Sequence, residues 1–268
     1  MTMRRLAGLL LLTMTIGGGV GCMRNVHVPD DQRMSSYNDG PYRAVLAATV
    51  RDGKVDYRRL RREFTGPLDV YLDGVARLGP RSEPEAFPTE QHVMAYRINA
   101  FNALVLKTWL LRGAGDDAAV LGLKPQWLVL DNWVIDGQRF DLHDFEYDVI
   151  RPGHDDWRLG FALVRGTMDS PPLLEEPYDG DRIDQQLDTQ VRRWMSDPDI
   201  LIVEGDTVRM PAFFDDWKAS LKPIGGLPGL IERYLPPDDP RRTPAIRAAV
   251  AGEIKFAKPD RTINALAR

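Results

Sequence analysis

Cysteine is nearly absent from this sequence of 268 residues, in which Cys22 is the only example. A chain with one cysteine forms no internal disulfide, and beyond position 22 it offers no thiol for nucleophilic catalysis or for a cysteine-ligated zinc site. Histidine is also scarce, with four residues whose spacing is not typical of a zinc site. We therefore expect the chain to hold no metal ion and no cofactor.

Positive charge is not in excess either, because 35 lysines and arginines stand against 39 aspartates and glutamates, a formal charge of -4. Domains that bind nucleic acid usually carry a basic surface, so this balance argues against a nucleic-acid partner. Internal repeats and low-complexity tracts are missing, which argues against solenoid and fibrous classes. A hydrophobic content of 43% is enough to form a core in a chain of this length.

A hydrophobic run long enough to cross a bilayer, about 20 residues, is missing as well. The apolar stretch Leu6–Ile16 is shorter than this. It follows Arg4 and Arg5 and precedes the small residues Gly17–Gly21, which is the order of a secretory signal peptide. We predict that residues 1–21 are a signal peptide that is removed.

Cys22 directly follows Gly19-Val20-Gly21, and this tetrapeptide resembles a bacterial lipobox. In a lipobox the signal peptide is cut before the cysteine, and the cysteine carries acyl chains such as palmitate. Each buried methylene of such chains contributes about 0.8 kcal/mol to membrane binding. The tetrapeptide predicts a lipoprotein of the bacterial cell envelope, anchored to a membrane with its domain outside the cytoplasm. The alternative is an ordinary signal peptide that happens to contain a cysteine.

The rest of the chain divides into a polar segment and a domain. Residues 22–40 lack periodicity and are interpreted as the lipidated cysteine and a flexible tether, while residues 41–268 are interpreted as a single globular domain. Helical spacing of apolar residues dominates this domain, Asp136-Gly137 and Glu204-Gly205-Asp206 indicate hairpins, and Arg158–Val164 indicates a strand. We predict an α+β fold: a mainly helical single domain with two β-hairpins and a short additional strand.

One helix is predicted to be central to the domain. Thr89 is a suitable N-terminal cap, the apolar periodicity runs to about Arg112, and Gly113 is a suitable stop. Asn99 and Asn102 lie three residues apart on one face of this helix. A buried amide without a partner costs about 1–3 kcal/mol, so both amides need hydrogen-bond partners if they are buried.

Four segments, in order along the chain, resemble the motifs of the domain of unknown function 547 (DUF547) family. They are Val55-Asp56-Tyr57, the helical segment Tyr96–Leu104, the segment Phe161–Leu173, and the run Asp260–Asn264. The resemblance spans Val55 to Asn264 and implies a bacterial envelope protein with no settled activity. It assigns Tyr57, Asp260 and Asn264 to a structural motif.

The sequence departs from the family pattern where relatives usually carry cysteines. Gly160 stands in place of a histidine, and Arg165 and Ser170 stand in place of cysteines, so a thiol activity of relatives cannot be transferred. Ser170 is the candidate substitute nucleophile, with His92 or His143 as base, and would make the chain an envelope hydrolase or acyl transferase. The Asp-Ser-Pro sequence is also an ordinary turn.

Two arginines are candidates for ligand binding. Arg97 and Arg165, together with Asn99 and Asn102, would bind a carboxylate or phosphate group if they met in one cleft. In the alternative, Arg97 pairs with a carboxylate such as Asp260 and stabilises the fold. We favour a non-catalytic domain that binds a small anionic ligand or an envelope protein, and keep the Ser170 enzyme as the alternative.

Overall fold

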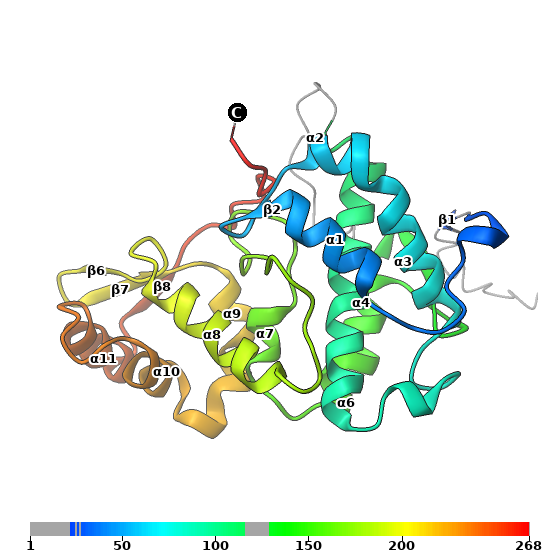
Figure 1. Ribbon diagram of the computed structural model, residues 1–268. Helices are drawn as coiled ribbons and strands as arrows, with labels where there is room; N and C mark the ends of the chain where they lie inside the picture. Colours follow the sequence, from blue (N-terminus) through cyan, green and yellow to red (C-terminus); the bar gives the residue numbers. More distant parts are fainter. Residues whose placement is uncertain (1–21, 25, 27, 116–128, 268) are drawn as a thin grey trace, which may run out of the picture.

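The computed structural model describes residues 22–24, 26, 28–115 and 129–267. Helices dominate this part of the chain and the sheets are small, which confirms the predicted α+β, mainly helical class (Figure 1). None of the described helices is long and apolar enough to span a bilayer.

The described residues form the following helices and strands, given in chain order. The helices are η1 (Asp30–Gln32), α1 (Gly40–Thr49), α2 (Tyr57–Arg59), η2 (Leu60–Phe64), α3 (Thr65–Arg77), η3 (Pro84–Ala86), α4 (Glu90–Leu111), α5 (Leu142–Asp144), η5 (Phe145–Ile150), α6 (Arg151–Gly153), α7 (Leu159–Ala162), α8 (Ile183–Ser196), α9 (Phe213–Trp217), η6 (Lys218–Ile224), α10 (Gly226–Tyr234) and α11 (Arg242–Ala251). The strands are β1 (Cys22–Met23), β2 (Val50–Arg51), β3 (Lys54–Val55), β4 (Asp131–Ile135), β5 (Gln138–Phe140), β6 (Ile202–Glu204), β7 (Thr207–Met210) and β8 (Ile254–Phe256).

Helix α4 is central, as predicted. The Thr89 side chain caps it by accepting a hydrogen bond from the His92 backbone N–H at 3.4 Å. Nearly every side chain from Ala95 to Leu110 is buried, because neighbouring elements cover the helix on all sides. The chain leaves the helix through Gly113, whose φ of 91° is one that glycine adopts without strain.

Both predicted hairpins are present. Asp136 and Gly137 have φ values of 47° and 72°, the left-handed pair that a two-residue turn between β4 and β5 requires. Gly205 turns β6 into β7, and β8 adds a parallel strand beside β7. A third hairpin, β2–β3, turns at Asp52-Gly53 and was not expected from the sequence.

The strand predicted for Arg158–Val164 is wrong. This segment contains the short helix α7, and all four of its residues are buried. An apolar run that is covered on all sides shows neither the helical nor the strand period, so its pattern does not distinguish the two. At Gly160 a Cβ atom would lie 2.5 Å from the Trp217 ring, so glycine lets α7 approach α9 closely.

The described part of the predicted tether, residues 22–40, packs against the domain rather than extending from it. Strand β1 pairs with β4 in parallel, with Cys22 opposite Asp131. Val28 and Met34 are buried, and the Met34 side chain fills the space beside Gly74. The physical reason is that Met34 packs against α3 at Gly74, an apolar contact that the polar composition of the segment conceals.

The domain has two hydrophobic cores. The first surrounds α4 and includes α1, α3 and η5, and the second lies under α8, α10, α11 and the β6–β7–β8 sheet, at the left of Figure 1. Phe213 of α9 packs against both cores. The region where they meet is therefore bordered by α9 and the segment that follows α7.

Candidate functional site

A cavity of about 300 Å³ lies where the two cores meet. Its wall is formed by the loop 165–170, by α5 and η5, by α9, and by the segment 259–266, which we call the closing segment. The lining residues are His143, Tyr147, Leu163, Arg165, Thr167, Asp169, Ser170, Ala212, Phe213, Asp216, Trp217, Pro259 and Arg261.

The Asn102 amide positions the start of the 165–170 loop. It donates a hydrogen bond to the carbonyl oxygen of Ala162 at 2.9 Å and accepts one from the backbone N–H of Val164 at 3.0 Å. About two helical turns further, the Trp109 indole N–H donates to the carbonyl oxygen of Arg165 at 3.0 Å. Helix α4 thus holds the loop from beneath.

The Asn99 amide positions the chain that follows the loop. It donates to the carbonyl oxygen of Tyr178 at 2.8 Å and accepts from the Tyr178 backbone N–H at 2.9 Å. Asn99 and Asn102 are each only 2% exposed, and neither lines the cavity. Both amides of the predicted ligand set therefore serve the backbone in this structure.

The closing segment holds the loop from the other side. The Met168 backbone N–H donates to the carbonyl oxygen of Thr262 at 2.9 Å, and the Asn264 backbone N–H donates to that of Gly166 at 3.0 Å. The Asn264 side chain accepts from the Tyr57 hydroxyl at 3.2 Å, so the first and last motifs of the chain meet here. Asp260 is exposed, and its carboxylate accepts from the Thr262 backbone N–H at 2.9 Å.

Ser170 is bonded to backbone groups alone among the described residues. Its Oγ accepts from the Arg165 backbone N–H at 3.0 Å and donates to the carbonyl oxygen of Pro171 at 3.2 Å. Of the two candidate bases, His143 lines the same cavity, whereas His92 lies beside Gly180 and contacts Thr89. No described histidine bonds to Ser170, so the geometry does not activate this serine.

A buried carboxylate that the sequence analysis missed controls the charge beside the cavity. Glu146 is fully buried and accepts from Arg165 Nη2 at 2.5 Å and from Arg151 Nη2 at 2.6 Å. Two guanidinium groups thus share one carboxylate, which leaves one positive charge in excess. Both Phe145 and Glu146 face inward because η5 is a π-helical turn, whose register differs from the α-helical period used to read the sequence.

The Arg165 side chain keeps capacity for a further partner. Its guanidinium carbon lies 5.3 Å from the centre of the Phe101 ring, and its Nη1 is buried without a hydrogen-bond partner among the described residues. The side chain remains 25% exposed and lines the cavity. The Arg151 guanidinium, by contrast, lies 4.0 Å from both the Tyr147 and the Trp217 rings.

Arg97 does not join Arg165. Its Nη1 lies 3.1 Å from Nε2 of His154, and Arg97 does not line the cavity. The predicted alternative, an ion pair between Arg97 and Asp260, is wrong. The physical reason is that Asp260 stays in an exposed turn at the closing segment. Burial, together with the neighbouring Arg97 charge, lowers the pKa of His154 to about 4.

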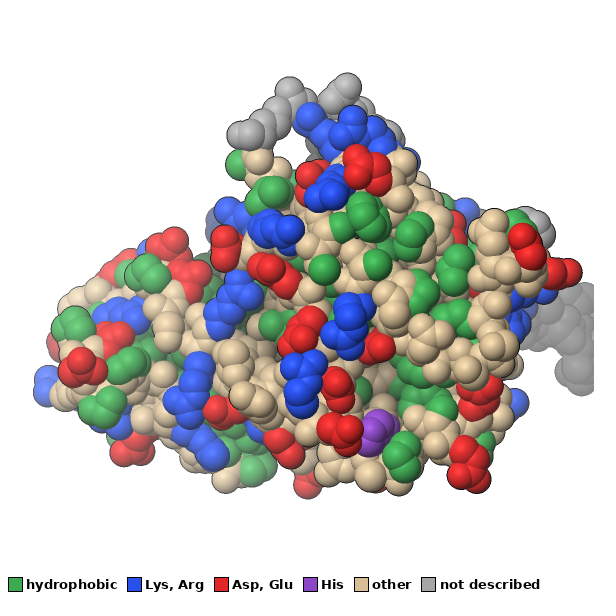
Figure 2. Space-filling model, in the orientation of Figure 1, with side chains coloured by type: hydrophobic (Ala, Val, Ile, Leu, Met, Phe, Trp, Pro, Cys, Tyr) green, Lys and Arg blue, Asp and Glu red, His purple; other side chains and the backbone are tan. Residues whose placement is uncertain are grey.

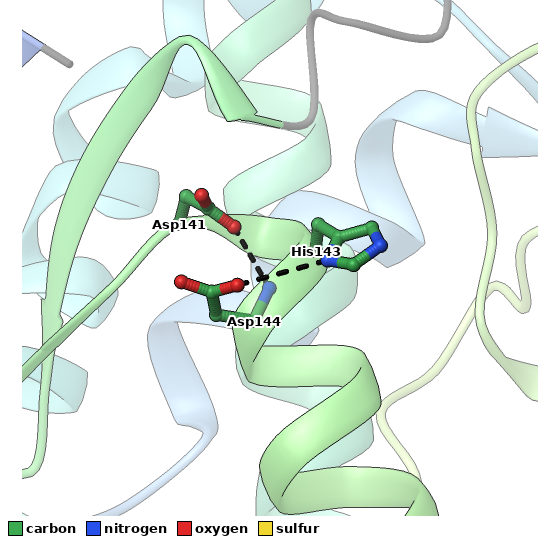
Figure 3. Close-up of side chains that lie close together, drawn as sticks. All are labelled: Asp141, His143 and Asp144. Atoms are coloured by element: carbon green, nitrogen blue, oxygen red, sulfur yellow. Dashed lines mark hydrogen bonds and ion pairs between the residues drawn. The ribbon is translucent and has the colours of Figure 1, made fainter. Parts of the chain in front are cut away.

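One group of described residues, Asp141, His143 and Asp144, has ligand atoms within 4.8 Å of one another (Figure 3). The Asp141 carboxylate accepts from the Asp144 backbone N–H at 2.8 Å and so caps α5. His143 Nδ1 lies 3.7 Å from the Asp144 carboxylate at the surface. Helix capping and a surface ion pair account for this arrangement.

Comparison with known proteins identifies one family model that matches part of the chain. No curated protein and no solved structure matches the chain significantly. Residues 85–195 match the family model described as "Protein of unknown function, DUF547". This range holds Asn99, Asn102, Glu146, Arg165 and Ser170, and so includes α4 and most of the cavity wall. Over residues 85–195 the chain is therefore similar to the DUF547 family, whose function is unknown.

Proposed function

We propose that this chain is a lipid-anchored envelope protein whose domain binds a small anionic group in the cavity beside Arg165, without covalent catalysis. The observation that carries the proposal is the sharing of Glu146 by Arg151 and Arg165, while the Arg165 side chain remains 25% exposed in the cavity wall. A carboxylate or phosphate group accepts charge-assisted hydrogen bonds from a guanidinium and would compensate its unshared charge.

The shape of the site supports a small ligand. A volume of about 300 Å³ is at the lower end of the range for small-molecule sites, and Tyr147, Phe213 and Trp217 supply apolar walls. On the face drawn in Figure 2, basic and acidic side chains are interspersed, with no broad field of one sign. This surface favours a ligand held in a cavity over a highly charged macromolecule.

The contacts of Ser170 support a non-catalytic role. A serine nucleophile needs a base within hydrogen-bond reach, and the Ser170 hydroxyl instead donates to the carbonyl oxygen of Pro171. The alternative enzyme rests on the shared position of Ser170 and His143 in the cavity wall. A fluorophosphonate probe tests it, because an activated serine becomes labelled. We expect no label on Ser170.

The binding proposal is tested with 3-phenylpropionate, a carboxylate with one ring, and with inorganic phosphate. We expect saturable binding of at least one of them to the wild-type protein, measured by tryptophan fluorescence. Arg165→Gln should weaken this binding about 10- to 100-fold, since a charged hydrogen bond contributes about 1.5–3 kcal/mol. The matched control is Arg192→Gln, because Arg192 is exposed and pairs with Asp188 outside the cavity.

Two results would contradict the proposal. One is that neither anion binds to the folded wild-type protein. The other is that Arg165→Gln and Arg192→Gln bind the anion as the wild type does. Circular dichroism of each variant shows that loss of binding does not come from unfolding.

A further inference from the structure

The wall that contains Arg165 also carries a negative charge that no described residue compensates. Helix α9 lines the cavity with Phe213, Asp216 and Trp217. The exposed Asp216 carboxylate makes no hydrogen bond or ion pair with any described residue. Its neighbour Asp215 lies outside the cavity and pairs with Lys218 Nζ at 2.5 Å.

The other carboxylate in the cavity wall is already engaged. Asp169 accepts a hydrogen bond from the Thr167 hydroxyl at 2.7 Å, and burial raises its pKa. Arg261 of the closing segment lies close enough to act on the same carboxylate electrostatically. Asp169 therefore already has a partner in the wall, whereas Arg165 and Asp216 remain as two opposite charges on separate elements.

The same wall also offers apolar surface. Phe213 and Trp217 come from the same short helix as Asp216, and Leu163 lies on the approach to the loop. A ligand with only an anionic group would leave Asp216 facing its apolar body, and a ligand with only a cationic group would leave Arg165 without an acceptor. Unpaired charges of this kind select against the wrong ligand.

We propose that the ligand is a zwitterionic amino acid with an apolar side chain. Its carboxylate binds Arg165, its ammonium group binds Asp216, and its side chain packs along Phe213 and Trp217. This inference rests on the proposed function, because it uses the same cavity and the same arginine, and it adds the second charge and the apolar body to the ligand.

Three probes with one ring and different charges test the inference. Phenylalanine carries both charges, 3-phenylpropionate only the negative one and 2-phenylethylamine only the positive one. We expect phenylalanine to bind the wild-type protein at least tenfold more tightly than either of the others. Asp216→Asn should remove the advantage over 3-phenylpropionate, whereas the matched control Asp215→Asn should keep it.

The outcomes separate this inference from the function on which it rests. If 3-phenylpropionate binds in an Arg165-dependent manner and phenylalanine binds no better, the anion site at Arg165 is supported and the proposal of a zwitterionic ligand is wrong. If the advantage of phenylalanine survives Asp216→Asn, the assignment of Asp216 is wrong. If no probe shows Arg165-dependent binding, both proposals fail. Asp216 is exposed, so its substitution leaves the fold intact and makes the comparison direct.

Discussion

At the scale of the residue, His154 couples the stability of the fold to pH. Burial and the adjacent Arg97 lower its pKa to about 4, whereas an unfolded histidine titrates near 6.5. Between these values the unfolded state binds more protons, so the free energy of unfolding falls as the pH is lowered through this window. The coulombic effects of Glu90 and Asp156 oppose the shift but are smaller.

We predict that His154→Gln, which keeps a hydrogen-bond acceptor for Arg97, removes this part of the pH dependence. Urea denaturation at pH 7 and pH 4.5 measures it. The wild-type protein should lose on the order of 1–3 kcal/mol more than the variant between the two pH values. Other carboxylates contribute equally to both proteins and cancel. Identical losses in the two proteins would show that His154 takes up a proton as readily in the folded state as in the unfolded state.

Single residues also show where prediction from sequence ends. The helix face with Asn99 and Asn102 could be predicted, because their spacing depends on the local period alone. Their partners near Ala162 and Tyr178 lie 60 and 79 residues away and depend on how the chain is packed. Glu146 could not be predicted as a buried group, because a π-helical turn changes which side chain faces inward.

At the scale of the element, the closing segment completes the cavity wall. The Asn264 side chain accepts from the Tyr57 hydroxyl and donates to the carbonyl oxygen of Gly53 at 3.2 Å. We predict that Asn264→Ala lowers the free energy of unfolding by about 2 kcal/mol and Tyr57→Phe by about 1 kcal/mol, because the first variant leaves more buried groups unpaired.

The double variant distinguishes this contact from two independent effects. Because the two side chains share one hydrogen bond, the double variant should lose less stability than the sum of the losses of the two single variants. Urea denaturation of the four proteins completes the cycle. Strictly additive losses would show that the hydrogen bond between Tyr57 and Asn264 contributes nothing to stability.

Elements were predictable where their signals are local. The hairpin at Asp136-Gly137 depends on two residues with positive φ, and α4 begins and ends at residues suited to caps. Helix α7 was not predictable, since a segment buried on every side has no amphipathic period. The pairing of β8 with β7 joins strands that are distant in sequence, so no local pattern predicts it.

At the scale of the whole molecule, the membrane anchor is the prediction that matters most. We predict that the mature chain begins at Cys22 and carries lipid there. Cys22→Ala should move the protein from the membrane fraction to the soluble fraction, since acyl chains supply the membrane affinity. Mass spectrometry of the purified wild-type protein shows the acyl mass. A Cys22→Ala protein that remains in the membrane fraction after a carbonate wash would contradict the lipid anchor.

The hydrogen bond between Tyr57 and Asn264 joins residues 207 positions apart. Contacts of such long range form late in folding, because a large loop of chain must close before they become favourable. During synthesis, a nascent chain that has emerged only as far as α11 lacks the closing segment, which holds one side of the loop 165–170. The proposed anion site should therefore be among the last features that this polypeptide completes, after its core helices have already assembled.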